Sequence, residues 1–214
     1  MQAVLLVGGF GTRLQAVVKD VPKPMAPIGT IPFLKYLYDL LKEQGVTDFL
    51  FLTGYKSEII EEYFKDYQNI KFIKEENPLG TGGALLNAYD ELEDEFLFVN
   101  GDTFFDLDLS ILCEFASDRP LTLALRYTDN ISRYGFVKVE DRADYRVEAF
   151  VEKGSLDKEY IDGYINGGVS YFKKELLREF KAGFKLQPIS LESEIYPMLV
   201  EKGLVFGLPM GGLF

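Results

Sequence analysis

Two runs of residues in this sequence have the types and spacing expected of a site that handles phosphate. They are Leu6-Val7-Gly8-Gly9-Phe10-Gly11-Thr12-Arg13-Leu14 and Pro22-Lys23-Pro24. Glycine lets a backbone approach a ligand closely and turn its N–H groups toward phosphate oxygens, and Arg13 and Lys23 add positive charge. Leu14 replaces the third glycine of the dinucleotide-binding pattern, and no Gly-Lys-Ser/Thr is present, so neither common nucleotide motif fits. A plain turn with a solvated lysine stays open as the alternative.

A second glycine-rich run, Pro78-Leu79-Gly80-Thr81-Gly82-Gly83-Ala84, lies between a predicted strand and a predicted helix. Two explanations are open and compatible with each other. Backbone groups at Gly80 and Gly83 could recognise the edges of a nucleotide base, although nothing here indicates which base. Thr81 could also cap the helix that follows, since its hydroxyl is suited to accept a backbone N–H.

An acidic residue, Asp102, follows the apolar run Leu97-Phe98-Val99-Asn100-Gly101. Ligands of α/β sheets bind at the carboxyl ends of strands. A carboxylate there, in a chain with no histidine and one cysteine, suits Mg²⁺, which prefers oxygen ligands and keeps several waters. The alternative is that Asp102 only caps a turn. Asp106 and Asp108 are interpreted as turn and cap residues.

The second half of the chain carries polar residues suited to a sugar phosphate. They are Arg133-Tyr134-Gly135, Glu152-Lys153, Asn166-Gly167 and Glu192. Carboxylates, amides and backbone groups can bind sugar hydroxyls, and Lys153 could hold a phosphate. Taken singly, Glu152 and Lys153 are equally explained as a solvated ion pair, and Asn166-Gly167 as a turn.

The elements expected to position these residues alternate between strands and helices. We predict strands at Ala3–Val7, Asp48–Thr53, Asn69–Lys74 and Phe96–Asn100, and helices at Pro32–Gln44, Ser57–Tyr67 and Gly82–Leu92. Apolar runs without polar alternation suit strands buried on both faces, so the fold class is α/β, a Rossmann-like doubly wound sheet. Later strands are predicted at Leu121–Tyr127, Gly135–Val139, Arg146–Glu152 and Gly168–Phe172, which makes the sheet mixed.

Length and composition limit the possible functions. The 214 residues suffice for one domain, with a nucleotide-binding half over about 1–110 and a sugar-phosphate half over about 111–214. A net charge of -11 argues against nucleic-acid binding as the main role. Cys113 is the one cysteine, so an intrachain disulfide is excluded. The apolar N-terminal run is too short for a signal or membrane segment, so we expect a cytoplasmic protein.

The pattern Gly8-Gly9-x-Gly11-Thr12-Arg13-Leu14 with Pro22-Lys23-Pro24 resembles the signature of the sugar-nucleotide pyrophosphorylases, also called sugar-1-phosphate nucleotidyltransferases. The resemblance extends along nearly the whole chain and is closest to the D-glycero-α-D-manno-heptose 1-phosphate guanylyltransferases. It implies the nucleotide-diphospho-sugar transferase fold. It also implies nucleotide contacts from Leu6, Gly8, Gly9, Gly11, Thr12, Arg13, Lys23, Gly80, Thr81, Gly83, Asn100 and Gly101.

The same resemblance implies roles for the remaining candidates. Asp102 would bind Mg²⁺, and Lys153 would contact the sugar phosphate. The sugar itself would lie against Tyr134, Gly135, Glu152, Asn166, Gly167 and Glu192. The residues that carry catalysis would be Arg13, Lys23, Asp102 and Lys153.

The activity implied by the resemblance joins GTP to D-glycero-α-D-manno-heptose 1-phosphate, giving GDP-heptose and pyrophosphate for bacterial surface polysaccharide or capsule synthesis. A homodimer is expected by analogy. One alternative is a hexose 1-phosphate with GTP, dTTP, UTP or CTP. Another is a catalytically silent nucleotide-binding regulator, against which the joint presence of Arg13, Lys23, Asp102 and Lys153 argues. A nicotinamide dehydrogenase would need the missing glycine and an acidic residue where the second strand ends at Thr53-Gly54.

The C-terminal run Val205–Phe214 is apolar and ends in Gly211-Gly212-Leu213-Phe214. By the resemblance, a second magnesium carboxylate would lie in a motif just after this strand. We therefore expect that the sequence given stops short of a natural segment that carries it. The alternative is a hydrophobic tail packed into the core.

Overall fold

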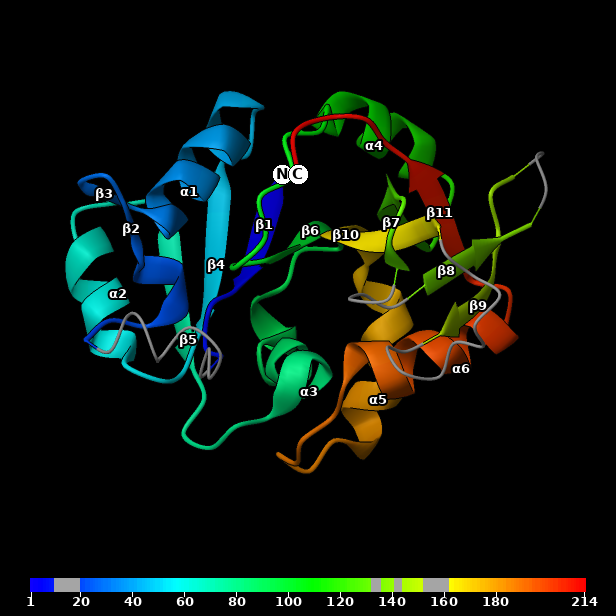
Figure 1. Ribbon diagram of the computed structural model, residues 1–214. Coiled ribbons are helices and arrows are strands. Elements are labelled where there is room, and N and C mark those ends of the chain that lie inside the picture. The colour runs from blue at the N-terminus through cyan, green and yellow to red at the C-terminus, as the bar shows by residue number, and fades with distance from the viewer. Residues whose placement is uncertain (10–19, 132–135, 141–143, 152–161) are drawn as a thin grey trace.

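The structure, a computed structural model, describes residues 1–9, 20–131, 136–140, 144–151 and 162–214 (Figure 1). Its main sheet has nine strands in the order β11-β7-β10-β6-β1-β4-β5, with β8 and β9 branching from β10. These strands are β1 (Gln2–Leu6), β4 (Asp48–Thr53), β5 (Ile70–Lys74), β6 (Glu95–Asn100), β7 (Leu121–Thr128), β8 (Phe136–Val139), β9 (Val147–Val151), β10 (Gly163–Lys173) and β11 (Val205–Pro209). A separate hairpin pairs β2 (Pro27–Ile28) with β3 (Ile31–Pro32).

Helices pack on both faces of this sheet (Figure 1). They are α1 (Phe33–Glu43), α2 (Ser57–Phe64), α3 (Gly80–Asn87), α4 (Leu109–Ala116), α5 (Arg178–Gly183) and α6 (Tyr196–Glu201). Short 3₁₀ turns cover Lys23–Met25, Tyr89–Glu91 and Lys174–Leu177, and a π-helical turn covers Leu191–Ile195. In the described part of the chain, no helix is long and apolar enough to cross a bilayer.

The first half of the sheet is parallel, as the alternating pattern predicts. Central β1 pairs with β4 on one side and β6 on the other, so that Leu6 lies opposite both Leu52 and Asn100. The chain leaves β1 toward β4 and later reaches β6 on the opposite side. Such a change of direction opens a crevice at the carboxyl ends of the two strands, where α/β sheets bind ligands. The doubly wound α/β prediction is confirmed.

The unbroken apolar run of β4 follows from burial of the sheet on both faces. Successive side chains of a strand point to opposite faces. Phe49 and Phe51 accordingly join the core beneath α1 and α2, whereas Leu50 and Leu52 join the core beneath α3 and α6. Burying all four side chains stabilises the strand by about 1.5–3 kcal/mol each.

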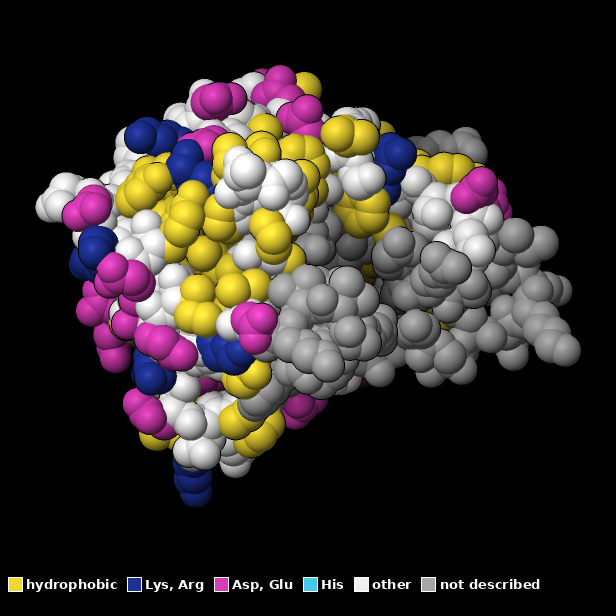
Figure 2. All heavy atoms as spheres, turned by 60° about the vertical axis from the view of Figure 1, so that its left-hand side comes forward, with side chains coloured by type: hydrophobic (Ala, Val, Ile, Leu, Met, Phe, Trp, Pro, Cys, Tyr) yellow, Lys and Arg dark blue, Asp and Glu magenta, His cyan; other side chains and the backbone are white. Residues whose placement is uncertain are grey.

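Some hydrophobic side chains stay on the surface. Figure 2 shows them gathered over the elements at the left of Figure 1, which include β2, β3 and α1. The exposed members from these elements are Ile28, Ile31 and Tyr36, with exposed fractions of 54%, 39% and 38%. Apolar surface of this kind marks a candidate contact area.

The second half of the sheet departs from the prediction in two ways. Strand β10 begins five residues before the predicted start at Gly168 and runs antiparallel between β6 and β7. Its register shifts between Asn166 and Ser170, so the predicted turn at Asn166-Gly167 is an irregularity within a strand. Helices α4, α5 and α6 have no counterpart among the predicted elements. The predicted cap is confirmed, because Asp108 accepts from the N–H groups of Ser110 and Ile111 at the start of α4.

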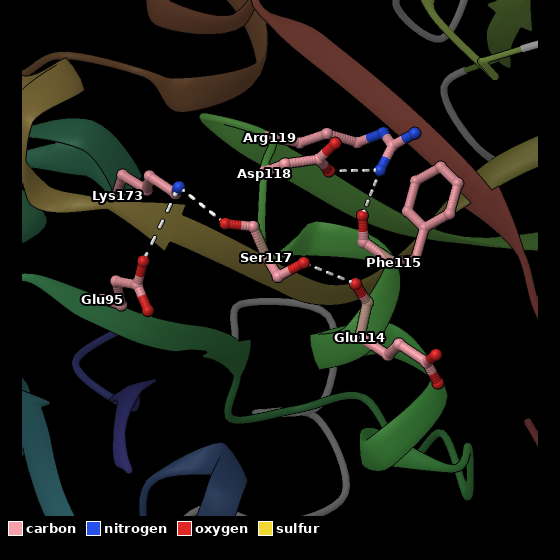
Figure 3. Close-up of polar contacts among 7 residues, drawn as sticks. All are labelled: Glu95, Glu114, Phe115, Ser117, Asp118, Arg119 and Lys173. Carbon is pink, nitrogen blue, oxygen red and sulfur yellow. Dashed lines mark hydrogen bonds and ion pairs between the residues drawn. The ribbon is translucent and has the colours of Figure 1, made fainter.

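Polar contacts anchor β10 to its neighbours at the end of α4 (Figure 3). Lys173 Nζ donates to Ser117 O at 2.8 Å and lies 3.7 Å from a Glu95 carboxylate oxygen. Arg119 donates to Phe115 O, and its guanidinium carbon lies 3.9 Å from the centre of the Phe115 ring. These contacts fix the connection between α4 and β7.

The C-terminal residues lie on the surface beside Phe105. The predicted strand at the start of this run is confirmed as β11. After it, Asp106 N–H donates to Leu213 O at 2.8 Å, and the ring of Phe214 meets that of Phe105 at 5.4 Å. Leu213 is 68% exposed and Phe214 41% exposed, whereas Val205 is buried in the core and Leu208 and Met210 pack against it.

Candidate active site

The two strand ends that flank the crevice are in direct backbone contact. Gly101 N–H donates to Leu6 O at 3.0 Å, one step beyond the β1–β6 pairing. A methyl group at Gly101 would lie 2.5 Å from Val7 Cγ1 and 2.6 Å from Leu6 O, which is closer than packed atoms allow. Glycine at position 101 is therefore required by the packing of these loops, and its predicted nucleotide contact stays a prediction.

The two described glycines of the first run differ in their surroundings. Gly8 is buried, its carbonyl accepts from Tyr55 N–H at 3.2 Å, and a methyl group there would lie 3.0 Å from Gly54 N. Gly9 is exposed, and a methyl group there would have no atom of the described residues within 4 Å. Gly8 thus serves the packing of β1 against β4, while Gly9 offers the open backbone that a ligand could approach.

Lys23 and Asp102, two of the predicted catalytic residues, form an ion pair although 79 residues separate them. The 3₁₀ turn that carries Lys23 is anchored by buried Pro24 and Met25 and by the bond from Met25 N–H to Pro22 O at 2.8 Å. The side chains remain accessible, at 36% for the lysine and 43% for the aspartate. An accessible cation and carboxylate therefore meet at the end of β6.

Asp102 is not explained as a turn cap. Among the described residues, its oxygens accept from Lys23 and, at 3.3 Å, from the Thr103 hydroxyl, and not from a backbone N–H group. An accessible carboxylate is a suitable oxygen ligand for Mg²⁺, which binds through one or two carboxylates plus substrate phosphates. No group of three or more acidic side chains with metal-binding geometry occurs in the described ranges. The single carboxylate of Asp102 is enough for Mg²⁺ that is otherwise bound by substrate phosphates and water.

The glycines of the second run pack against a distant segment of the chain. The N–H groups of Gly82 and Gly83 donate to Ile189 O at 2.9 and 3.0 Å, and a methyl group at Gly80 would lie 2.6 Å from that oxygen. These close contacts account for the glycines without a ligand. Because the Gly83 donor is already used, this geometry does not favour base recognition by that group.

Thr81 has a different role from the predicted cap. Helix α3 begins at Gly80 with Leu79 as its N-cap, so Thr81 lies inside the helix and the cap interpretation is wrong. Its hydroxyl accepts from Leu191 N–H at 2.8 Å and donates to Glu192 Oε2 at 2.7 Å. The Ser190 hydroxyl donates to the same oxygen at 3.2 Å. Thr81, which was predicted to contact the nucleotide, is therefore hydrogen-bonded to Glu192, which was predicted to contact the sugar.

Asn166 and Gly167 shape the irregular part of β10. Asn166 Oδ1 accepts from Gly168 N–H at 3.0 Å, which holds the shift in register. A methyl group at Gly167 would lie 2.5 Å from the Phe105 ring, and one at Gly168 would lie 3.3 Å from Asn100 Cβ. Packing explains both glycines, and Asn166 is half-buried.

Glu75 is a residue of this edge that the sequence analysis missed. It follows β5 as Asp102 follows β6, and its Oε2 accepts from Leu79 N–H at 2.9 Å. Burial raises the pKa of its carboxyl group, and the Leu79 N–H lowers it by less. The signal that could have found it is an acidic residue directly after a predicted strand, the same signal that identified Asp102.

Several predicted site residues lie outside the described ranges. They are Gly11, Thr12, Arg13, Tyr134, Gly135, Glu152 and Lys153. The described candidates that gather at the carboxyl ends of β1 and β6 are Leu6, Gly8, Gly9, Asn100, Gly101 and Asp102, with Lys23 beside Asp102. Gly80, Thr81, Gly83 and Glu192 form a second group around the start of α3.

Residues 2–205 of this chain match the model of the family described as nucleotidyl transferase. A D-glycero-alpha-D-manno-heptose 1-phosphate guanylyltransferase of Campylobacter jejuni is 39% identical over 209 residues, 96% of this chain and 91% of that protein. Its namesake from Aneurinibacillus thermoaerophilus is 43% identical over 184 residues, 82% of this chain and 76% of that one. HddC from Yersinia pseudotuberculosis complexed with GMP-PN has a TM-score of 0.81 at 33% identity, covering 97% of this chain and 89% of HddC.

Proposed function

This chain belongs to the nucleotidyl transferase family, and we propose that it transfers the GMP moiety of GTP to D-glycero-α-D-manno-heptose 1-phosphate, releasing pyrophosphate. The enzyme class and the nucleotide-diphospho-sugar transferase fold predicted from the sequence are confirmed. GTP and the heptose are supported by the names of the two relatives and by GMP-PN in the HddC complex. The structural observation that carries the proposal is the contact of Lys23 with Asp102 at the end of β6.

The proposed reaction needs no general base. A sugar 1-phosphate loses its second proton near pH ~6, so its oxygen is already anionic at pH 7. That oxygen forms a bond to the α-phosphorus of GTP while the bond from the α-phosphorus to the β-phosphate oxygen breaks, and pyrophosphate leaves with that electron pair. The absence of histidine from the sequence is consistent with this chemistry.

What the protein must supply is position and positive charge, because two polyanions have to meet. Lys23, at the end of its anchored turn, is proposed to neutralise the triphosphate. Arg13 and Lys153 are proposed to do the same for the nucleotide and the sugar phosphate. Asp102 is proposed to hold Mg²⁺, which when bound neutralises charge on the transferring phosphoryl group. In this arrangement Lys23 exchanges its contact with Asp102 for the substrate phosphates.

The sugar is proposed to lie between Glu192 and the irregular part of β10. Hydrogen bonds from Thr81 and Ser190 hold one oxygen of Glu192, which leaves its other oxygen to accept from sugar hydroxyls. The half-buried amide of Asn166 adds a group that can donate and accept. Tyr134, Gly135 and Glu152 are proposed to complete this side of the site.

We propose in addition that the protein acts in the cytoplasm as a homodimer, in the synthesis of a bacterial surface polysaccharide or capsule. The exposed Ile28, Ile31 and Tyr36 are the surface that supports self-association. Light scattering of the purified protein would measure its oligomeric state. A monomer at all concentrations would contradict the dimer without affecting the proposed reaction.

The test of the activity is pyrophosphate release over a grid of GTP, dTTP, UTP and CTP against heptose and hexose 1-phosphates, with and without Mg²⁺. We expect the fastest release from GTP with the heptose, and loss of release in Lys23→Ala. Discrimination against a hexose could be as small as ~10–100-fold, because one CHOH group distinguishes the two sugars. Faster turnover with dTTP or UTP contradicts the choice of base. GTP binding without release for any sugar phosphate identifies a silent regulator.

A further inference from the structure

Lys23 occupies the carboxylate that is proposed to bind the metal. Its Nζ donates to Asp102 Oδ2, and the Thr103 hydroxyl donates to Asp102 Oδ1 at 3.3 Å. Among the described residues, Lys23 is the one cation that forms an ion pair with this carboxylate. Both oxygens of Asp102 therefore already accept a hydrogen bond, and its negative charge is balanced within the protein itself.

The backbone on each side of this ion pair is fixed. The 3₁₀ turn Lys23–Met25 follows a proline and contains another, and its proline and methionine side chains are buried. Proline rings restrict the backbone angles of such a turn. On the other side, Thr103 N–H donates to Asn100 O at 3.2 Å, which closes a turn around Asp102. The lysine can therefore leave Asp102 only by a rotation of its own side chain.

We propose that Lys23 acts as a gate on the metal site. In the nucleotide-free protein its ammonium group holds Asp102 and lowers the affinity of this carboxylate for Mg²⁺. The triphosphate of GTP opens the gate, because its phosphate oxygens take the ammonium group and leave the carboxylate to the metal. The inference rests on the proposed function and adds an order of binding to it. The metal binds at Asp102 together with the nucleotide or after it, and not before.

The charges at Asp102 favour this order. The ammonium group of Lys23 repels a divalent cation, and in the described ranges no cluster of three or more acidic side chains with metal-binding geometry offsets that repulsion. A polyanion can open the pair easily, because its two side chains are 36% and 43% exposed and exposed ion pairs are individually weak. A triphosphate also brings the oxygen ligands that Mg²⁺ takes in addition to one or two carboxylates. Lys23 therefore hinders the metal alone, and not the metal with its nucleotide.

The experiment titrates the protein with Mn²⁺, without nucleotide or sugar phosphate, and follows unbound Mn²⁺ by electron paramagnetic resonance. Mn²⁺ takes the same oxygen ligands as Mg²⁺. We expect Lys23→Gln to bind Mn²⁺ about 10-fold more tightly than the wild type, the effect of removing one unit charge about 4 Å from a divalent ion in water with screening by salt. Lys23→Arg keeps the charge and should keep the wild-type affinity. Lys35→Gln is the matched control, because Lys35 forms the same kind of ion pair with Asp39 on α1, and it should leave the affinity unchanged.

An unchanged affinity in Lys23→Gln overturns the inference, and so does an equal gain in Lys35→Gln, which would reflect net charge alone. Adding Asp102→Asn to Lys23→Gln should remove the gain. A gain that persists in this double variant places the metal elsewhere and overturns the inference too. Failure of the proposed function is a separate result. It would be a protein in which Lys23→Gln tightens Mn²⁺ binding as expected, while the wild type releases no pyrophosphate from GTP and the heptose 1-phosphate.

Discussion

The proposed nucleotide side and the proposed sugar side of the site are held by different kinds of contact. On the nucleotide side, backbone groups at strand ends bond to each other, as Gly101 N–H does to Leu6 O and Tyr55 N–H to Gly8 O. On the sugar side, Glu192 is held by the hydroxyls of Thr81 and Ser190. Backbone contacts follow from the register of the sheet, whereas a hydroxyl contact depends on one side chain. The sugar side should therefore be the easier one to disturb without unfolding the protein.

The largest effect should come from the two lysines proposed for the two substrates. Lys23→Ala removes a charged hydrogen bond to the triphosphate and leaves Asp102 without its cation, so we expect a loss of about 3 kcal/mol, or ~100-fold in kcat/KM for GTP. Lys153→Ala should instead raise KM for the sugar 1-phosphate. Steady-state kinetics with each substrate varied separately tells the two apart. Unchanged sugar-phosphate kinetics in Lys153→Ala would contradict its assignment.

A backbone change on the nucleotide side should lower stability as well as turnover. Gly101→Ala places a methyl group 2.6 Å from Leu6 O, and overpacking of this kind costs about 1–3 kcal/mol. The loops that carry Asp102 and Gly8 would separate. Urea unfolding measures the stability. Gly183→Ala is the control: among the described residues nothing lies within 4 Å of the added methyl group, so stability should change by less than about 1 kcal/mol. Equal effects of both substitutions would contradict the close contact.

A side-chain change on the sugar side should act more selectively. Thr81→Val keeps the shape but removes the hydroxyl that orients Glu192 and satisfies Leu191 N–H. We expect KM for the sugar 1-phosphate to rise about 5–10-fold, with a smaller change for GTP. Thr81→Ser keeps the hydroxyl and should restore wild-type values. A rise in KM for GTP alone would instead place Thr81 against the nucleotide.

The same contrast explains how far the sequence predicted the molecule. Strand β4 was predicted to the residue, because its apolar run is buried on both faces and has no other explanation. Helix α1 was predicted because Pro32 and Gly45 mark its ends. The early part of β10 was missed, since glycines interrupt its pattern and the register shift after Asn166 has no sequence signal.

In the site, Asp102 was predicted because ligands of α/β sheets bind at the carboxyl ends of strands. Lys23 was predicted from the stiff Pro-Lys-Pro segment. Their contact could be expected from the topology. The bond between Thr81 and Glu192 could not, because it joins residues 111 positions apart through a segment whose packing no local pattern specifies. Glu75 could have been predicted in the same way as Asp102, because it directly follows β5.

The smallest effect should be a gain in stability when Glu75 loses its charge. Burial raises the pKa of Glu75 in the folded protein above its ordinary value of 4.5. A carboxyl group with a raised folded-state pKa favours folding below pH 4.5, and that contribution is lost as the pH rises through the folded-state pKa. At neutral pH the ionised, half-buried carboxylate therefore costs stability.

Glu75→Gln keeps the shape and an acceptor for Leu79 N–H but carries no charge. We expect its melting temperature to exceed that of the wild type at pH 7, by less than the loss caused by Gly101→Ala, with the difference shrinking toward pH 4.5. Thermal unfolding between about pH 4 and pH 7.5, without nucleotide, measures this. A variant less stable than the wild type at pH 7 would mean that Glu75 holds the loops of the nucleotide side together by its charge. Backbone contacts alone would then not hold these loops, and the contrast between a side held by backbone contacts and a side held by side chains would not apply at Glu75.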